Sequence, residues 1–275
     1  MNNQCHITIM KNGAQVDINE EVRYLQSPVY EVIRIIEGTP LFFQEHMKRF
    51  QTSLELVNYE CAYSSETIFD QIKNLIETTG LKDNNIRLEY GVTDLGMILM
   101  LFMVKSEYPN KSFYEQGVRV KTACIVRGNP HAKLVNKHYL EQISALKAVS
   151  DVYEIILKNE AGKIAEGSKS NLFFIKDQTI YSAKEADILM GITRLELMAI
   201  FEKLDLTYIE LDIYEETLER YEACFLSGTS IGVLPIESVN EMKYNSTSNH
   251  VIIKLMGAYN TAVKNNLENT RRLYL

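Results

Sequence analysis

Three short stretches in the middle of the chain carry residue types that could do chemistry on a phosphorylated molecule. The first contains a lysine, Lys133, in the sequence Ala-Lys-Leu-Val-Asn. The second begins with a carboxylate, Glu166, in Glu-Gly-Ser-Lys-Ser-Asn. The third, Met-Gly-Ile-Thr-Arg at residues 190–194, has the pattern of a helix start. Together they supply an amine that can attack a carbonyl carbon, an acid, and helix N–H groups that attract a phosphate.

The order of these motifs resembles the fold-type IV family of pyridoxal phosphate enzymes. That family contains branched-chain aminotransferases, D-amino acid aminotransferases and aminodeoxychorismate lyases. Three further segments carry the likeness: Val-Tyr-Glu-Val-Ile-Arg at 29–34, Glu-His-Met-Lys-Arg-Phe at 45–50, and Leu-Ser-Gly-Thr-Ser at 226–230. The matches span roughly residues 28–236, and their shared order makes the resemblance specific.

The resemblance implies a pyridoxal 5'-phosphate cofactor and a role for each matching residue. Lys133 is expected to bond to the cofactor, and Glu166 is expected to face its ring nitrogen; these two are the expected catalytic residues. The other residues expected to bind the cofactor are Arg49, Leu189, Ile192, Thr193 and Thr229. Arg49 and the helix start at Ile192 and Thr193 correspond to the family's phosphate contacts, and Leu189 to the residue that packs on the ring.

The substrate is expected to lie beside Tyr30, Arg87 and the turn that contains Gly228 and Ser230. Arg87 is the first candidate for the substrate carboxylate, because its strand serves that purpose in the family. A structural arginine paired with an acid is the alternative at this position. Arg127 is another candidate for the same carboxylate.

The phrase Tyr139-Leu-Glu-Gln follows Lys133 a residue or two later than the family pattern places it. If that phrase sets the register, Lys137 is the alternative cofactor lysine. Tyr139 resembles a tyrosine that some members place near the phosphate. The histidines His46, His131 and His138 have no metal-ligand spacing with cysteine or aspartate, so no metal is expected.

The composition excludes several other classes of protein. Apolar residues make up 46% of the 275, charged residues make up 24%, and the net charge of −7 argues against nucleic acid or an anionic membrane as the main partner. The longest apolar run, at 97–104, has the length of a strand and not of a membrane span. Four scattered cysteines and a first segment without a secretion signal favour free thiols in the cytoplasm.

The hydrophobic spacing predicts an α+β chain. Helices are expected at 45–57, 65–79, 139–150, 193–204, 214–220 and 249–265. Strands are expected at 28–36, 85–91, 97–104, 118–126, 153–157, 172–176, 208–212 and 223–226. The break around Pro109 predicts a small N-terminal α/β domain at 1–108, a linker at 109–112 and a larger, β-barrel-like α+β domain at 113–275. The resemblance places the cofactor at the interface of these domains.

The function that the resemblance implies is transfer of an amino group between an amino acid, with a branched-chain-like L-amino acid favoured, and a 2-oxo acid. The implied assembly is a homodimer. Two alternatives stay open: an aminodeoxychorismate lyase of 4-aminobenzoate and folate synthesis, and a D-amino acid aminotransferase. The arginine–histidine pair that resembles D-specific relatives is missing from residues 92–126. A cofactor-binding dimer without catalysis is a further reading if Lys133 is not the cofactor lysine.

Overall fold

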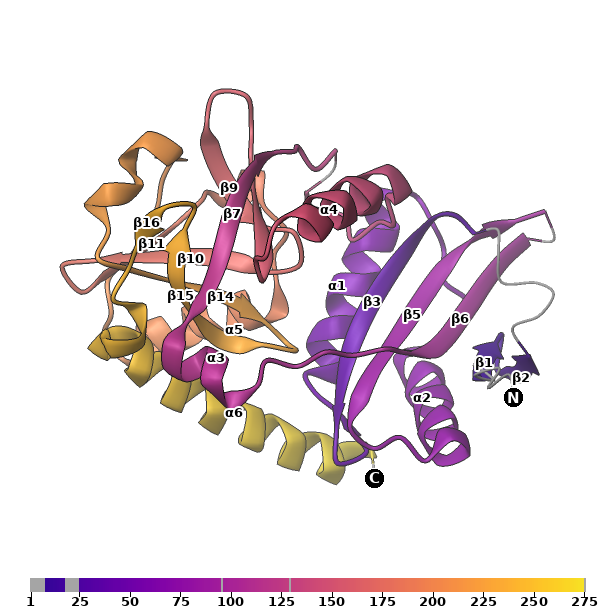
Figure 1. Cartoon of the computed structure of the whole chain (residues 1–275). Coiled ribbons are helices and arrows are strands. Elements are labelled where there is room, and N and C mark those ends of the chain that lie inside the picture. Colours follow the sequence, from indigo (N-terminus) through magenta and orange to yellow (C-terminus); the bar gives the residue numbers. More distant parts are fainter. Residues whose placement is uncertain (1–7, 18–24, 95, 129, 275) are drawn as a thin grey trace, which may run out of the picture. The chain divides into compact units, whose positions relative to one another are not determined.

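The computed structural model describes residues 8–17, 25–94, 96–128 and 130–274, and these form two compact units (Figure 1). Unit 1 comprises 1–107, 132–135 and 263–275, and unit 2 comprises 108–131 and 136–262. The expected linker at 109–112 follows the first border between them. The division into domains stays a prediction. Residues 132–135, which include Lys133, belong to unit 1 although the residues on either side of them belong to unit 2.

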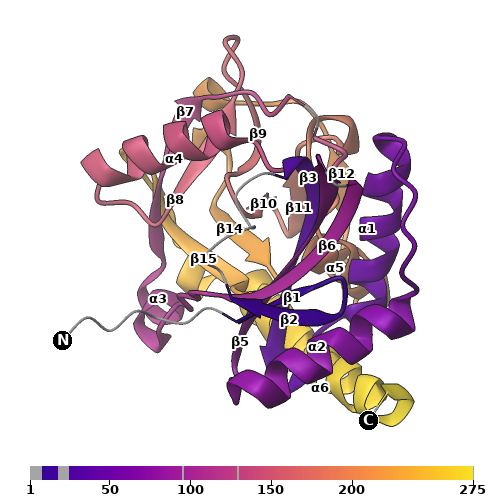
Figure 2. The same ribbon diagram turned by 90° about the vertical axis from the view of Figure 1, so that its right-hand side faces the viewer.

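Unit 1 is a six-stranded antiparallel sheet, counted over the described residues, with two helices on one face (Figure 2). The strand order is β2 (Ala14–Asp17), β1 (Thr8–Lys11), β6 (Gly96–Val104), β5 (Asn84–Thr93), β3 (Gln26–Ile36) and β4 (Thr39–Pro40). The helices are α1 (Phe43–Leu56) and α2 (Ser65–Thr79). The expected helix at 65–79 is confirmed, and the one at 45–57 is confirmed to within two residues.

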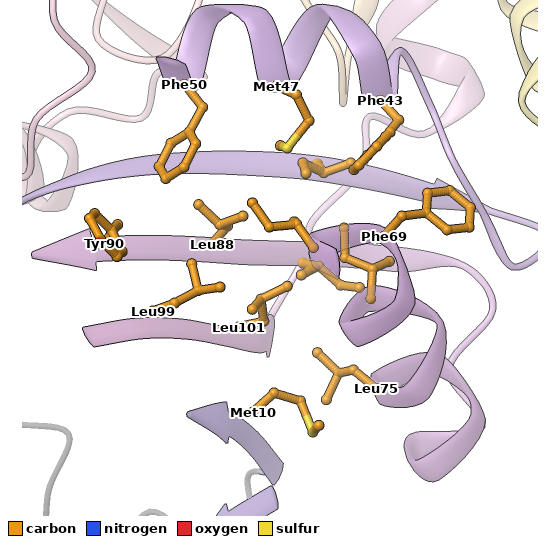
Figure 3. Packing of buried hydrophobic residues seen from close by; sticks show 14 of the residues in the cluster. Met10, Phe43, Met47, Phe50, Phe69, Leu75, Leu88, Tyr90, Leu99 and Leu101 are labelled. Atoms are coloured by element: carbon orange, nitrogen blue, oxygen red, sulfur yellow. The ribbon is translucent and has the colours of Figure 1, made fainter. Parts of the chain in front are cut away.

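The core of unit 1 follows from two periodicities. On α1, Phe43, Met47 and Phe50 recur at helical spacing, and Figure 3 shows all three pointing toward the strands. On β5, Leu88 and Tyr90 alternate with polar residues and face the same helices. The opposite face of β5 therefore carries its charged side chains, which become important for the site.

Unit 2 is a ten-stranded mixed sheet, again counted over the described residues. Its path is β12 (Tyr208–Glu210), β11 (Thr179–Ser182), β10 (Asn171–Lys176), β14 (Ala223–Gly228), β15 (Gly232–Val239), β7 (Val118–Cys124), β8 (Glu154–Lys158), β9 (Lys163–Gly167) and β13 (Ile213–Tyr214), with β16 (Met242–Lys243) beside β15. The pairs β11–β12, β15–β7 and β7–β8 are parallel and the others are antiparallel.

Three helices belong wholly to unit 2: α3 (Lys111–Gln116), α4 (Lys137–Val149) and α5 (Ile192–Lys203). Short 3-10 turns lie at Glu185–Asp187, Glu215–Arg220 and Ser246–Ser248. The last helix, α6 (His250–Tyr274), begins in unit 2 and ends in unit 1. The α+β class is confirmed. The helix expected at 214–220 is a 3-10 helix, and α6 is longer than the expected 249–265. The strands that were not predicted are β1, β2, β4, β9, β11, β13, β15 and β16.

Candidate active site

Lys133 lies on a short segment that pairs with the edge of β3. The Tyr30 N–H donates to the Lys133 carbonyl at 2.9 Å, and the Val135 N–H donates to the Pro28 carbonyl at 3.0 Å. The Lys133 N–H itself donates to Ser53 Oγ of α1 at 3.3 Å. Because the backbone of Lys133 is bonded on both sides, its amine extends from a fixed point of unit 1.

The Tyr30 ring contacts two basic side chains of the same unit. The Lys133 amine is 5.2 Å from the ring centroid, and the Arg87 guanidinium is 4.4 Å from it. An aromatic face carries negative partial charge, so both contacts are attractive. The Arg87 Nε also donates to Glu89 Oε1 at 2.5 Å. Three of the predicted residues, Lys133, Tyr30 and Arg87, thus lie close together. The Arg87 guanidinium is hydrogen-bonded to the carboxylate of Glu89.

A buried acid, Glu31, lies on the helix side of β3 and was not predicted. Its carboxylate is fully buried and accepts hydrogen bonds from Arg49 Nε at 2.7 Å, from Arg49 Nη2 at 2.5 Å, and from His46 Nδ1 at 2.8 Å. Burial raises the pKa of Glu31, but the Arg49 charge and these hydrogen bonds lower it by more, so the net shift is downward. Glu31 is therefore a buried anion that orients Arg49.

His46 is the neutral partner in this group. Burial lowers its pKa, the hydrogen bond and the charge of Glu31 raise it, and the charges of Arg49 and Lys133 lower it again. A neutral ring donates from Nδ1 to Glu31, which leaves Nε2 as an acceptor. Within the described ranges, that buried Nε2 has no hydrogen-bond partner. Helix α1 thus carries His46, Arg49 and Ser53 along one stripe, at spacings of three and four residues.

Glu166 is the centre of a second group, which lies in unit 2. Its side chain is 3% exposed. One oxygen accepts from Arg127 Nη1 at 2.8 Å, and the other accepts from Asn171 Nδ2 at 3.2 Å and from the Leu189 N–H at 3.1 Å. Arg127, a candidate for the substrate carboxylate, is therefore placed as the counter-charge of Glu166. Its guanidinium also lies 5.6 Å from the Tyr139 ring.

Asn171 connects the parts of this group. Its amide donates to Glu166 and, at 2.8 Å, to the Leu189 carbonyl. Its strand partner is Ser227, which precedes the predicted Gly-Thr-Ser turn. A Cβ atom added to Gly191 would lie 2.1 Å from Asn171 Oδ1, so only glycine fits at the start of α5. Sequence reasoning missed this role, although an asparagine beginning an apolar strand is an unusual choice.

The helix start and the turn were both predicted, and both lie in unit 2. Ile192 and Thr193 are the first residues of α5, and Gly191 before them has no side chain to cap the helix. Thr193 Oγ1 is 3.1 Å from Tyr259 Oη. Gly228 is the last residue of β14, and Thr229 and Ser230 lie in the turn that leads to β15; all three are half-buried. Ser227 Oγ beside it is buried without a hydrogen-bond partner among the described residues.

The alternative lysine, Lys137, is the first residue of α4 and is exposed. Asn136 caps this helix, accepting from the Tyr139 N–H at 3.0 Å, and Tyr139 Oη donates to the Ser168 carbonyl at 3.0 Å.

Over the described residues, no three His, Cys, Asp or Glu side chains gather as metal ligands. No helix in the same residues is long and apolar enough to cross a membrane.

Comparisons with known proteins identify the family and the fold. The family model "Amino-transferase class IV" matches residues 28–239. The chain is 24% identical to an aminodeoxychorismate lyase of Bacillus subtilis (86% of each chain) and 25% identical to a D-alanine aminotransferase of Bacillus licheniformis (84% and 85%). The fold is that of a branched-chain aminotransferase of Thermoproteus uzoniensis, solved with norvaline, at a TM-score of 0.81 over 96% of this chain and 97% of that one, with 21% identity.

The chain therefore belongs to the class IV aminotransferase family. Enzymes of this family use pyridoxal phosphate, and a branched-chain amino acid aminotransferase of the same fold was solved with pyridoxamine 5'-phosphate, so the expected cofactor is confirmed at the level of the family. The expected two-domain fold-type IV architecture is confirmed by the structural likeness. The names of the relatives cover a lyase, a D-alanine aminotransferase and branched-chain aminotransferases, so the family alone leaves the particular reaction open.

Replacing Glu31 with glutamine is expected to destabilise unit 1 at neutral pH, since Arg49 loses its buried counter-charge. Breaking a buried ion pair from one side costs about 3–5 kcal/mol. Because the Glu31 pKa is lowered in the fold, its contribution is present above the ordinary pKa of about 4.3 and is lost as the pH falls below it. The free energy of unfolding, measured by urea titration with circular dichroism, should decrease less steeply as the pH falls in Glu31→Gln than in wild type.

The control for this test is Glu107→Gln, since the Glu107 side chain is 84% exposed and pairs with Lys105 on the surface. That change should leave both the free energy of unfolding and its pH dependence as in wild type. If the free energy of unfolding of Glu31→Gln decreased with falling pH as steeply as that of wild type, the assignment of Glu31 as a buried anion would be contradicted.

Replacing Gly191 with alanine is expected to destabilise unit 2 by about 1–3 kcal/mol, the usual cost of forcing extra atoms into a packed site. The new methyl group would displace the Asn171 side chain and with it one donor to Glu166. Thermal unfolding measures the loss. Gly257→Ala on α6 is the matched control, because nothing lies within 4 Å of its added Cβ; it should keep or raise stability. Equal behaviour of both variants would refute the packing argument.

Proposed function

We propose that this chain is a pyridoxal phosphate-dependent aminotransferase that moves an amino group between an L-amino acid, with branched-chain donors favoured, and a 2-oxo acid. The observation that carries the proposal is the group around Glu166. This buried carboxylate is bonded through Asn171 and the Leu189 N–H to the segment that leads directly into α5. The acid that would face the ring nitrogen and the helix start that would bind the phosphate are therefore held in one hydrogen-bonded group.

The residues present fit the cofactor. Gly191 leaves the helix start without a side-chain cap, and the buried Ser227 hydroxyl lacks a partner in the described part of the chain. Backbone N–H groups at such a start suit a phosphate. We propose that Ile192, Thr193, Thr229 and Arg49 hold the phosphate group and that Leu189 packs on the ring. Glu31 would then serve to aim Arg49, through the bonds already described.

When bound, pyridoxal phosphate supplies a carbonyl carbon for amines and a ring that takes up electrons from the substrate Cα. We propose that the Lys133 amine holds that carbon and, once released, moves the proton from Cα as general base and acid. Glu166 keeps a proton on the ring nitrogen by its negative charge. Arg127 compensates that charge within the fold, so the carboxylate is not left unpaired in a buried place.

The substrate side of the proposal rests on Tyr30, Arg87 and the turn at 228–230. The amine of Lys133 lies beside the Tyr30 ring, so a substrate bonded in its place would meet that ring. The backbone N–H groups of Gly228 and Ser230, together with the Arg87 charge, are the proposed carboxylate contacts. The chain is further proposed to act as a cytoplasmic homodimer with the division into domains that the resemblance implies.

The lyase is the competing function, because a relative covering most of the chain carries that name. A lyase would expel pyruvate from aminodeoxychorismate, whereas an aminotransferase passes the amine to a 2-oxo acid. The deciding experiment loads the protein with cofactor and follows loss of the visible absorbance of the lysine-bound form with paired L- and D-amino acids. Faster loss with D-alanine than with any L-amino acid would favour the D-specific enzyme, and pyruvate from aminodeoxychorismate would favour the lyase.

Borohydride reduction of the loaded protein, followed by peptide mapping, is expected to place the pyridoxyl label on Lys133. The physical reason is that the backbone of Lys133 is fixed on both sides, whereas Lys137 is exposed on the first turn of α4. Lys137→Ala is the matched control and should still be labelled at Lys133. A label on Lys137 with Lys133 unmodified would overturn the assignment.

Replacing Glu166 with glutamine is expected to leave the cofactor bound but to remove most turnover. The amide accepts and donates hydrogen bonds, but it lacks the negative charge that keeps a ring nitrogen protonated. Loss of a group that acts mainly in the transition state is expected to lower the rate by about a hundredfold or more. Cofactor content by absorbance and the rate of a single half-reaction measure the two effects. Wild-type turnover in Glu166→Gln would remove Glu166 from the mechanism.

A further inference from the structure

Arg194, the last residue of the motif at 190–194, has no part in the function proposed above, although its side chain is fully buried. It lies in the first turn of α5, directly after the two residues proposed to hold the phosphate. Its Nη1 donates to Ser182 Oγ at 3.0 Å, and its Nη2 donates to Glu210 Oε1 at 2.7 Å. Burying a cation is costly, so its place at this helix start calls for a physical reason.

Glu210 holds the two ends of one segment with its two carboxylate oxygens. Residues 183–191 leave β11 and lead through Leu189 into α5. Before Leu189, the Glu185 N–H donates to Glu210 Oε2 at 3.0 Å; after it, the Arg194 side chain donates to Oε1. Glu210 itself lies on β12, which pairs with β11. These three residues, Glu185, Arg194 and Glu210, form a clasp that joins the ends of the segment.

Glu210 acts in this clasp as an anion. Partial burial raises its pKa, but the hydrogen bonds from the Glu185 N–H and the Tyr208 hydroxyl, together with the charge of Arg194, lower it by more. The Arg194 guanidinium also lies 5.3 Å from the Phe173 ring and 5.7 Å from the Tyr208 ring. Aromatic faces attract a cation, so the clasp is held by charge at one side and by rings at the other.

The clasp matters to the candidate site because of what lies between its two ends. The Leu189 N–H donates to Glu166, and the Leu189 carbonyl accepts from Asn171. The uncapped start of α5 follows directly after Gly191. The segment is therefore attached at its middle to the acid proposed to face the cofactor ring, and at its ends to Glu210.

We infer that Glu210 and Arg194 are positioning residues, which hold Leu189 and the start of α5 in the arrangement that receives the cofactor. The inference rests on the proposed function, which assigns this helix start to the phosphate. When the clasp is broken, the segment can move away from Glu166 while the rest of unit 2 stays folded. The apparent affinity of a ligand falls with the fraction of molecules in which its site is correctly arranged.

The test measures binding of pyridoxamine 5'-phosphate to the full-length, cofactor-free protein by titration calorimetry. This ligand has an amine in place of the carbonyl group, so it cannot bond to Lys133 and reports on the remaining contacts. Glu210→Gln replaces one acceptor oxygen by an NH₂ group and so releases one end of the segment. The dissociation constant is expected to rise about tenfold, the effect of losing a hydrogen bond to a charged group. Backbone amides of 185–194 should exchange with deuterium faster than in wild type.

The double variant Arg194→Met/Glu210→Gln separates positioning from stability. Replacing a buried ion pair by uncharged groups is often neutral for stability, so this variant should unfold near the wild-type temperature. It still lacks the link between the ends of the segment, so exchange at 185–194 should stay fast and the affinity low. If exchange and affinity returned to wild-type values together with stability, the pair would be structural only and the inference would be overturned.

The matched control is Glu215→Gln, which breaks another partly buried ion pair of unit 2. Glu215 pairs with Lys158, and its side chain is 31% exposed, against 27% for Glu210. This variant should keep the wild-type affinity and the wild-type exchange at 185–194. Weakening of the ligand by the same factor in Glu215→Gln as in Glu210→Gln would overturn the inference.

The transfer assay on cofactor-loaded wild-type protein reports separately on the proposed function. If the Glu210 and Arg194 variants weaken the ligand as expected and wild type transfers no amino group, the two positioning residues stand and the aminotransferase is refuted. If wild type transfers amino groups and Glu210→Gln binds the ligand as wild type does, the aminotransferase stands and the role of the clasp is refuted.

Discussion

A carboxylate that is taken out of water must be given a cation and hydrogen-bond donors, and both parts of the candidate site are built around one such group. Glu31 is fully buried in unit 1 with Arg49 and His46, and Glu166 is 3% exposed in unit 2 with Arg127 and two N–H donors. Removing one partner would leave an uncompensated buried charge, at a cost of several kcal/mol. These charged contacts therefore tie together the strands and helices from which they come.

The two acids have different tasks in the proposal. Glu31 acts within the protein, since its bonds orient an arginine and a neutral histidine near Lys133. Glu166 is directed to the cofactor ring, and its bonds to Asn171 and the Leu189 N–H connect it to the start of α5. Lys133 itself is positioned by backbone pairing with β3 and by a hydrogen bond to the Ser53 side chain, and these contacts fix the point from which its amine extends.

Elements with strong local signals could be predicted from the sequence. For α2, apolar spacing was reinforced by the Ser64 side chain, which caps the helix start, and by Gly80 in the left-handed region at its end. The strands β9 and β15 escaped prediction for physical reasons. Lys163–Gly167 is short and polar, and Pro235 within β15 argues against a strand when read alone. Both strands form because neighbouring strands supply the partners for their backbone hydrogen bonds.

The residues of the candidate site likewise fall into those that the sequence predicted and those that only the structure revealed. Motifs with a fixed order predict roles for Lys133, Glu166, the helix start and the turn, and in unit 2 Asn171 is hydrogen-bonded to Glu166 and to the Leu189 carbonyl ahead of that helix start. Glu31 and Asn171 could not be assigned from sequence, because each depends on a partner 18 residues away that only the fold brings into contact. The same holds for Arg127, whose ion pair with Glu166 joins residues 39 positions apart in the chain.

The central claim is that Lys133 and Glu166 act together in amino transfer. Mass spectrometry of a 2-oxo acid acceptor, incubated with a nitrogen-labelled branched-chain L-amino acid and the cofactor-loaded protein, tests it most directly. Labelled amino acid product is expected with wild type, and none above background is expected with Lys133→Ala. Label transfer that survives in Lys133→Ala would contradict the role of Lys133, and its absence in wild type with every L- and D-amino acid donor would contradict the aminotransferase activity.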